Sequence, residues 1–295
     1  MKRLTAGAAA LALAAGAACA ETPKPQRAAP TLDCTPAGPL VRLSHAPEAS
    51  GLAVSRRSPG HLWVINDSGG PVLFAVDTNG TRVGHVVLES ADLVDWEALA
   101  SGPCGGGHCL YVGDIGDNGA RRRHVTVYRV PEPDPSDASA PATAFHAAYP
   151  DGAHDAETLL IAPDGTLHIL TKGSTGPVAL YRFPRDLVEG VTMRLERVGE
   201  PMSEGRPPRA GRITDGAVSP DGTSVLLRSR TALTQLDAAT FFTGIWDDAR
   251  TMGLQDLNEP QGEAVAFGGG HTVYLAGEGG GAGAPGTLVT LTCRE

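Results

Sequence analysis

The stretch DWEALASGPCGGGHCLYVGDI, residues 95–115, contains the pattern that decides the fold. A run of small and acidic residues is followed by a glycine-rich turn and then by a more apolar run. Short runs of this kind between turn residues are typical of antiparallel β-hairpins. The same pair recurs four more times, as ASGLAVS with HLWVIND (49–67), DAETLLI with TLHILTK (155–172), ITDGAVS with SVLLRSR (213–230) and QGEAVAF with TVYLAGE (261–278).

Three of the five copies continue into a clear third strand, and fourth strands are plausible at 82–90, 143–150 and 191–198. Repeats of roughly 45 to 60 residues with four strands each are typical of β-propeller blades. We therefore predict an all-β chain that forms a single β-propeller of about five four-stranded blades, with a six-bladed ring as the alternative. A β-sandwich would also contain short strands, but it would not repeat the same chemistry at each strand start.

The last copy supplies only three strands and ends in GTLVTLTC (286–293), whereas PLVRLS (39–44) is a spare strand before the first copy. We expect this N-terminal strand to complete the last blade, which would bring Cys34 beside Cys293 at the seam of the ring. Cys104 and Cys109 flank a short glycine-rich loop, and we expect a second disulfide there. Four cysteines allow three pairings, and free thiols or a zinc site at CGGGHC are the weaker alternatives.

The N-terminus has the features of a secretory signal: a basic start, a short apolar run and the exit Ala18-Cys19-Ala20. We assign 1–20 to a signal peptide, 21–31 to a disordered linker and 32–295 to the propeller. The protein is then secreted or periplasmic, or lipid-anchored if Cys19 is acylated instead. No segment is long and apolar enough for a membrane span.

The net charge of -9 argues against nucleic acid as a partner, since no basic stripe compensates for it. No phosphate-binding or dinucleotide-binding glycine motif is present, so we expect no organic cofactor. We expect a monomer whose partners are a small polar ligand or a component of the cell envelope.

Acidic residues recur at the starts of the innermost strands, where a propeller gathers equivalent positions around its axis. The aligned positions are Ser50, Glu97, Glu157, Asp215 and Glu263. Further polar residues stand just before these positions or at the ends of the second strands, which return to the same face. They are Glu48, Asp95, Asp155, Asn66, Asp67, Asp114, Lys172, Arg228, Arg230 and Glu278.

Several carboxylates in one place repel one another unless a positive charge lies among them. Oxygen ligands suit Ca²⁺ or Mg²⁺. We predict a metal site formed by Glu97, Glu157, Asp215, Glu263, Asn66 and Asp114. Alternatively, Lys172, Arg228 and Arg230 neutralise the carboxylates in a salt-bridge network that needs no metal.

Two functions follow from this site. In the first, the propeller is a binding or scaffold protein, with Glu48, Asp67, Asp95, Lys172, Arg228, Arg230 and Glu278 around the ligand. In the second, it is a Ca²⁺-dependent hydrolase of a lactone, ester or phosphoester, in which His154, Asp155 or Glu157 transfers protons.

Several blocks of residues resemble those of exported bacterial propeller proteins that are labelled WD40-like or TolB-like. These blocks are NDSGG (66–70), DWE (95–97), GDIGDN (113–118), YRVPEP (128–133), DAE (155–157) with TK (171–172), and QGEA (261–264). A more distant likeness is to the calcium-dependent lactonases of the SMP-30/gluconolactonase type and to phytase-associated esterase-like propellers. The ligands of those families would fall on Glu97, Glu157, Asp215 and Glu263, with Asn66 or Asp114. The lactonases have six repeats, so this resemblance does not imply their activity.

Overall fold

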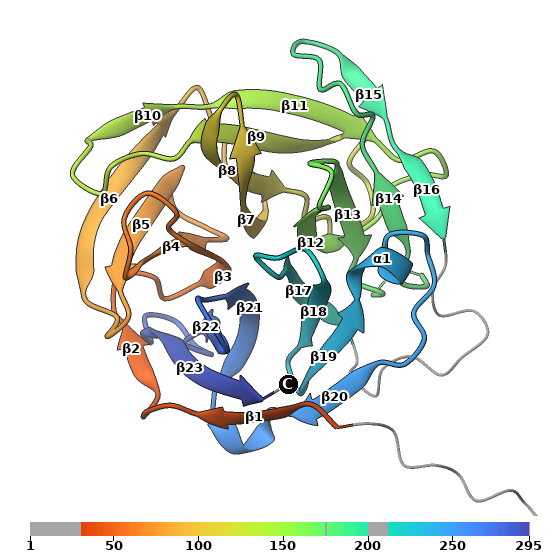
Figure 1. Cartoon of the computed structure of the whole chain (residues 1–295). Coiled ribbons are helices and arrows are strands. Elements are labelled where there is room, and N and C mark those ends of the chain that lie inside the picture. The colour runs from red at the N-terminus through yellow and green to blue at the C-terminus, as the bar shows by residue number, and fades with distance from the viewer. Residues whose placement is uncertain (1–30, 175, 200–211, 295) are drawn as a thin grey trace, which may run out of the picture.

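A computed structural model describes residues 31–174, 176–199 and 212–294 of the chain, and these residues form five mainly antiparallel sheets around a central axis (Figure 1). The predicted five-bladed, all-β propeller is thereby confirmed. The predicted signal peptide, and the linker up to residue 30, lie outside the described residues. Within the described ranges, no helix is long and apolar enough to cross a membrane.

Four blades take their strands in chain order from the axis outward. Blade 1 has β3 (Ala49–Val54), β4 (His61–Asn66), β5 (Val72–Asp77) and β6 (Arg82–Glu89), and blade 2 has β7 (Trp96–Cys104), β8 (Gly107–Asp114), β9 (Val125–Pro131) and β11 (Thr143–Ala148). Blade 3 has β12 (Ala156–Ile161), β13 (Leu167–Thr171), β14 (Leu180–Arg182) and β16 (Glu196–Gly199). Blade 4 has β17 (Ile213–Val218), β18 (Ser224–Ser229), β19 (Ala232–Asp237) and β20 (Arg250–Gly253), and the short helix α1 (Ala238–Phe241) and the 3₁₀ turn Gln255–Leu257 flank β20.

Blade 5 is built from both ends of the chain, as the sequence predicts. It has β21 (Gln261–Phe267), β22 (Thr272–Glu278) and β23 (Gly286–Arg294), and its outer edge is formed by β1 (Asp33–Pro36) and β2 (Val41–Leu43), both antiparallel to β23. Cys34 lies opposite Cys293 and forms a disulfide with it, and a second disulfide joins Cys104 to Cys109. Both predicted disulfides are confirmed.

Two short strands link neighbouring blades in a way that the sequence did not predict. β10 (Ser139–Pro141) runs parallel to β6 of blade 1, and β15 (Thr192–Arg194) runs parallel to β11 of blade 2. Each is the connection that leads to an outer strand of the following blade. The predicted fourth strand at 191–198 is therefore two strands, of which only β16 belongs to blade 3.

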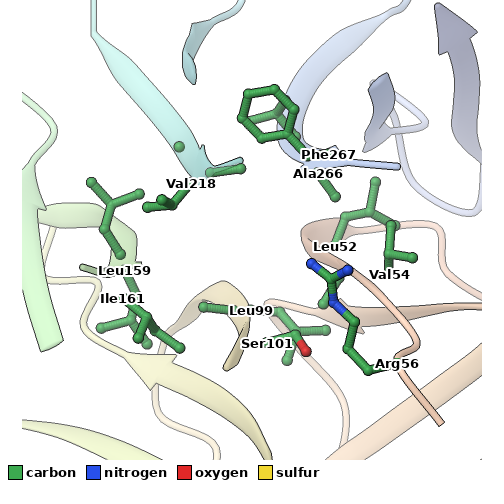
Figure 2. Close-up of a pocket in the computed structure, with 16 residues that line it drawn as sticks. Leu52, Val54, Arg56, Leu99, Ser101, Leu159, Ile161, Val218, Ala266 and Phe267 are labelled. Carbon is green, nitrogen blue, oxygen red and sulfur yellow. The ribbon is translucent and has the colours of Figure 1, made fainter. Parts of the chain in front are cut away.

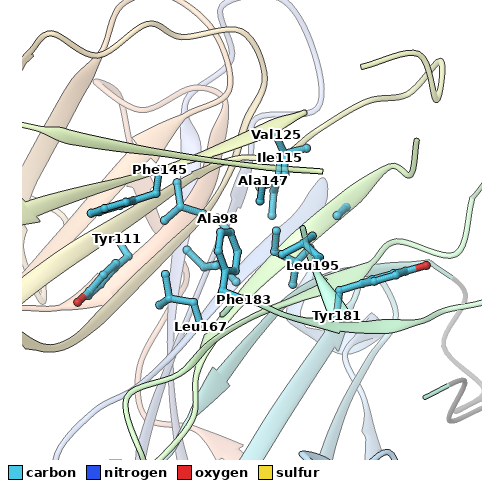
Figure 3. Packing of buried hydrophobic residues seen from close by; sticks show 14 of the residues in the cluster. Ala98, Tyr111, Ile115, Val125, Phe145, Ala147, Leu167, Tyr181, Phe183 and Leu195 are labelled. Carbon is cyan, nitrogen blue, oxygen red and sulfur yellow. The ribbon is translucent and has the colours of Figure 1, made fainter. Parts of the chain in front are cut away.

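Apolar side chains fill the spaces between neighbouring blades. Between blades 2 and 3, for example, Tyr111 and Phe145 from one blade pack in the same cluster as Leu167, Tyr181 and Phe183 from the other (Figure 3). These contacts are dry, because all five side chains are at most 6% exposed. Each large apolar side chain that is buried stabilises the fold by about 1.5–3 kcal/mol. The interfaces between blades are therefore the main source of stability.

Candidate functional site

Each innermost strand contains one extra residue near its start, where its register against the second strand shifts. Such β-bulges redirect the side chains beside them. The residues at these positions are Ser50, Glu97, Glu157, Thr214 and Glu263. Farther along the same strands, alternate residues such as Leu52, Leu99, Leu159 and Val218 converge on the axis at the opposite end of the channel (Figure 2).

Electrostatic contacts show that residues from several blades meet at the bulged end. Glu97 of blade 2 lies within Coulombic range of Asp67 of blade 1, Lys172 of blade 3 and Glu263 of blade 5. Only a position near the axis brings four blades so close together. We call this end of the channel the acidic mouth, formed by Asp67, Asp95, Glu97, Glu157, Lys172, Arg230, Glu263 and Glu278.

Asp215 does not occupy the position that the sequence alignment assigns to it. The bulge of blade 4 is at Thr214, one residue earlier, and Asp215 pairs with Arg228 in the regular ladder. Its buried carboxylate turns sideways and accepts a hydrogen bond of 2.8 Å from the backbone N–H of Val265 in blade 5. Burial raises the pKa of Asp215 despite this bond. Asp215 therefore connects two blades, and we leave it out of the proposed metal site.

Two carboxylates of the acidic mouth are paired with cations, as the salt-bridge alternative predicts. The ammonium group of Lys172, which follows β13, donates to Oε1 of Glu157, and both side chains are buried. Arg230, which follows β18, contacts Glu263 at 3.1 Å. Glu97 forms no ion pair with any described residue. Two cations therefore neutralise only part of the negative charge.

Burial raises the pKa of four carboxyl groups in the mouth, and neighbouring carboxylates add to the effect. The pKa of Glu97 rises to about 9, with Asp95 as the next cause, and that of Glu278 rises to about 7, with Glu263 as the next cause. The pKa of Asp67 rises to about 6, and that of Asp95 is also raised. Acidic groups therefore outnumber the cations that face them in the mouth, and at neutral pH the site retains protons that a bound cation could replace.

Several buried oxygen atoms near the mouth have no hydrogen-bond partner among the described residues. They include Oε2 of Glu157, Oγ1 of Thr214, Oδ1 of Asn66 and Oδ1 of Asp67. An unpaired buried acceptor is costly, and a bound cation or its water molecules would satisfy it. No three His, Cys, Asp or Glu side chains of the described residues are close enough together to enclose a metal ion. A cation held here would therefore keep part of its water shell.

The loop after β8 forms the wall of the mouth on the side of blades 2 and 3. Asp114 accepts hydrogen bonds from the backbone N–H of Asp95 at 3.0 Å and from the guanidinium of Arg122 at 2.7 Å. Asp155 accepts from the backbone N–H of Asp117 at 3.0 Å and from the hydroxyl of Ser174 at 2.7 Å. These two carboxylates hold the loop in place and are occupied by protein donors. Glu48, at the rim, accepts from Ser68.

Arg228, which we predicted to contact a ligand, lies inside the protein. Its side chain is 0% exposed and reaches between blades 4 and 5. It donates to the carbonyls of Ala264 and Ala276 at 2.5 and 2.9 Å, and it contacts Glu259 at 2.5 Å. It cannot touch a ligand in the mouth without leaving these partners. Arg228 therefore stabilises the interface between blades 4 and 5.

His154, the predicted general base, is held in a cluster of its own. Its Nε2 atom lies 3.0 Å from Asp151 Oδ1 and 2.9 Å from the hydroxyl of Tyr181. The Tyr181 hydroxyl also donates to Asp151. His154 is therefore engaged through Nε2 with Asp151 and Tyr181.

Replacing Glu97 by glutamine should stabilise the metal-free protein at alkaline pH. A carboxyl group whose pKa is raised on folding stabilises the protein below its unfolded pKa, near 4.5, and this contribution is lost as the pH rises toward about 9. Glutamine resembles the protonated form at every pH. We therefore expect Glu97→Gln to melt at least about 3 °C above the wild type at pH 8, with no difference at pH 4.5, in thermal melts with a chelator present.

The exposed Glu189 offers a matched control for this experiment. Glu189→Gln removes the same charge at a distance from the mouth and should not change the melting temperature at either pH. A stabilised Glu189→Gln protein would mean that net charge, and not the environment of Glu97, causes the effect.

Sequence reasoning missed two residues: Thr214, at the bulge of blade 4, and Glu259, the buried partner of Arg228. Thr214 carries no charge, so an alignment guided by carboxylates selected its neighbour Asp215. Glu259 lies in the connection before β21, outside the repeated pattern. The signal that could have identified Thr214 is the alternation of axial residues along β17, in which Val218 and Thr214 fall on the same face.

No protein-family model matches the chain, and no curated protein matches it. Among solved structures, the chain is similar to the PQQ-bound aldose sugar dehydrogenase of Streptomyces coelicolor, with 14% sequence identity and a TM-score of 0.52 over 90% of this chain and 100% of that one. It is also similar to a streptogramin B lyase, with 10% identity and a TM-score of 0.43 over 86% and 97% of the two chains. At these identities the first likeness shows the propeller fold alone. The families named from the residue blocks stay a resemblance.

Proposed function

We propose that the chain is an extracytoplasmic binding propeller whose acidic mouth binds a partly hydrated divalent cation, together with a small polar ligand that the cation helps to hold. The observation that carries this proposal is the excess of negative charge in the mouth. The pKa is raised at Asp67, Asp95, Glu97 and Glu278, while among the described residues only Lys172 and Arg230 form ion pairs with mouth carboxylates. Hard cations with oxygen ligands are the natural complement of such a site.

The unpaired oxygens of Glu157, Thr214 and Asn66 support the same proposal. The carboxylate of Glu97, which has no ion-pair partner among the described residues, adds to these acceptors, and Glu263 shares its charge with Arg230. Asp114 and Asp155 hold the wall of the site. Ca²⁺, which accepts irregular sets of oxygen ligands, fits this arrangement better than Mg²⁺, which demands near-ideal octahedral geometry.

Two disulfides support the extracytoplasmic location, because disulfides persist mainly in oxidising compartments. Whether the chain is released or attached through Cys19 is a separate part of the proposal. Metabolic labelling with a radioactive fatty acid tests it: label that disappears in Cys19→Ala would identify a lipoprotein.

Hydrolysis at the same mouth is the alternative function. It requires an unoccupied base beside the cation, and both His154 and Asp155 are bonded to other protein groups. The contacts of these two residues therefore favour binding. A panel of lactones, esters and phosphoesters assayed with Ca²⁺ tests the alternative, and turnover that Glu157→Gln abolishes would establish it.

Calcium should raise the melting temperature of the protein. A ligand that binds only the native state stabilises it by about 2.7 kcal/mol at one hundred times its Kd, which corresponds to a rise of about 5–10 °C for a chain of this size. Protein stripped with a chelator is melted in increasing Ca²⁺ or Mg²⁺, and isothermal titration calorimetry gives the stoichiometry. Glu157→Gln and Glu263→Gln should each abolish the rise. Each variant removes an anionic ligand and leaves the positive charge of Lys172 or Arg230 without its partner, so that it repels the cation.

The Glu189→Gln variant is the matched control here as well, and it should keep the full effect of Ca²⁺. The rise should also be larger at pH 8 than at pH 5, because protons compete with the cation for the mouth carboxylates. Chelated wild-type protein whose melting temperature responds to neither cation would contradict the proposal.

A further inference from the structure

We propose that a second binding site, which takes an organic anion with an apolar body, lies in a cleft between blades 4 and 5. The cleft has a volume of about 520 Å³. Pockets of about 300–1,000 Å³ are typical of small-molecule sites. The cleft opens at the end of the molecule opposite the acidic mouth, because the turns after β17 and β21 line it. The inference does not depend on the function proposed for the mouth.

The cleft is positively charged although the protein is acidic overall. The residues that line it and are charged at neutral pH are Arg56, Arg250, Arg294 and Asp221. Asp221 is occupied within its own turn, where Ser219 and the backbone N–H of Thr223 donate to it at 2.6 and 3.0 Å. Arg294 is paired with Asp33 at 3.6 Å, so the guanidinium groups of Arg56 and Arg250 remain against one carboxylate that is already satisfied. An anion is the complement of this arrangement.

Arg250 is placed as the main anchor for the anion. It lies on β20 and is half-buried, and its guanidinium group forms no hydrogen bond or ion pair with the described residues. Guanidinium groups that are partly removed from water bind carboxylate, sulfonate and phosphate groups strongly, because their paired N–H donors match two oxygens of the anion.

Arg56 approaches the cleft from the side of the channel and is held there by its backbone. Its N–H group donates to the buried carboxylate of Glu132 at 3.1 Å, and Glu132 also accepts from the indole of Trp63 at 3.1 Å. Figure 2 shows Arg56 and Phe267 at the apolar end of the channel. Glu132 is bonded to the backbone of Arg56, and the guanidinium group of Arg56 forms no hydrogen bond or ion pair with a described residue. This group is therefore available to a ligand.

The remaining lining explains why the ligand should have an apolar body. Phe267 and Pro220 contribute carbon surface, the buried Leu32, Leu226 and Val273 lie beneath it, and the glycine-rich turn Gly268–Gly270 leaves room above it. A fully polar anion such as inorganic phosphate would leave this surface wet and gain nothing from it. An aromatic or aliphatic carboxylate, sulfonate or phosphate ester would use both the guanidinium groups and the apolar wall.

The anionic dye anilinonaphthalene sulfonate is a suitable probe, since it combines an aromatic body with one sulfonate and fluoresces when it leaves water. We expect saturable one-to-one binding to the folded wild-type protein. Arg250→Gln should weaken this binding by about tenfold or more, since a charged hydrogen bond contributes about 1.5–3 kcal/mol. Arg250→Lys should weaken it less, and Arg56→Gln should also reduce the affinity.

Arg185→Gln is the matched control, because Arg185 is exposed on blade 3 and pairs with Asp164; this variant should bind the dye as the wild type does. The uncharged analogue N-phenylnaphthylamine should bind at least about tenfold more weakly than the sulfonate. Binding that does not saturate, an unchanged affinity in Arg250→Gln, or equal affinity for the uncharged dye would each overturn the proposal. Circular dichroism of each variant confirms that it is folded.

Discussion

The free energy of unfolding should fall by about 5–6 kcal/mol when Cys34 and Cys293 are both replaced by serine. The disulfide between them spans 259 residues and joins the N-terminal strand β1 to the last strand β23. In the chain-entropy account, a disulfide stabilises the protein more as the loop that it closes becomes longer. This disulfide closes a loop of nearly the whole described chain. Urea denaturation of both proteins without reductant measures the difference, with the slope of the transition checked for two-state behaviour.

The second disulfide provides an internal comparison. Cys104 and Cys109 are separated by only 5 residues, so their replacement by serine should cost about 2 kcal/mol. The protein without the seam disulfide should also be cut by protease first in the segment before β2, because β1 is then retained by β-ladder hydrogen bonds alone. Equal losses of stability for the two pairs would contradict a special role for the seam.

The second large effect is expected at Arg228, whose replacement by methionine should destabilise the protein by about 3–5 kcal/mol. The loss arises because Glu259, with its side chain 5% exposed, keeps a buried charge without a partner. Two carbonyls, those of Ala264 and Ala276, also lose a donor. Chemical denaturation of Arg228→Met against the wild type measures this cost.

The double variant Arg228→Met with Glu259→Gln distinguishes the buried charge from other effects. Removal of the unpaired carboxylate should restore part of the stability, so that the double variant is more stable than Arg228→Met alone. Replacement of the exposed Arg185 by methionine should change stability by less than about 0.5 kcal/mol. A double variant that is as unstable as the sum of both single variants would show that the two residues act independently.

The fold could be predicted because a propeller repeats its pattern. Five copies of one strand pair indicated the blades, and the missing strand of the last copy indicated that residues near 39–44 would complete it. The disulfide between Cys34 and Cys293 followed from that closure. These features depend on strand alternation and on chain order, both of which are present in the sequence.

The candidate site was harder to predict, because its geometry depends on single-residue shifts. All five innermost strands have a bulge at the equivalent position, and in blade 4 that position is Thr214, one residue before the acidic Asp215 that the sequence alignment selected. Arg228 and Arg230 stand two residues apart at the end of one strand, yet one is buried between blades and the other lies exposed beside Glu263. Their contacts are set by the neighbouring blade, which the local pattern does not describe. The linking strands β10 and β15 escaped prediction for the same reason.

The two ends of the central channel differ in a way that decides how ions can travel. At one end carboxylates surround the axis, whereas at the other end Leu52, Leu99, Leu159 and Val218 narrow a space of about 60 Å³ (Figure 2). A cation that entered this space would meet the guanidinium group of Arg56 and aliphatic side chains, which replace little of its hydration. A cation held at the carboxylate end, as we propose, would therefore exchange with solvent more easily through that end than through the channel.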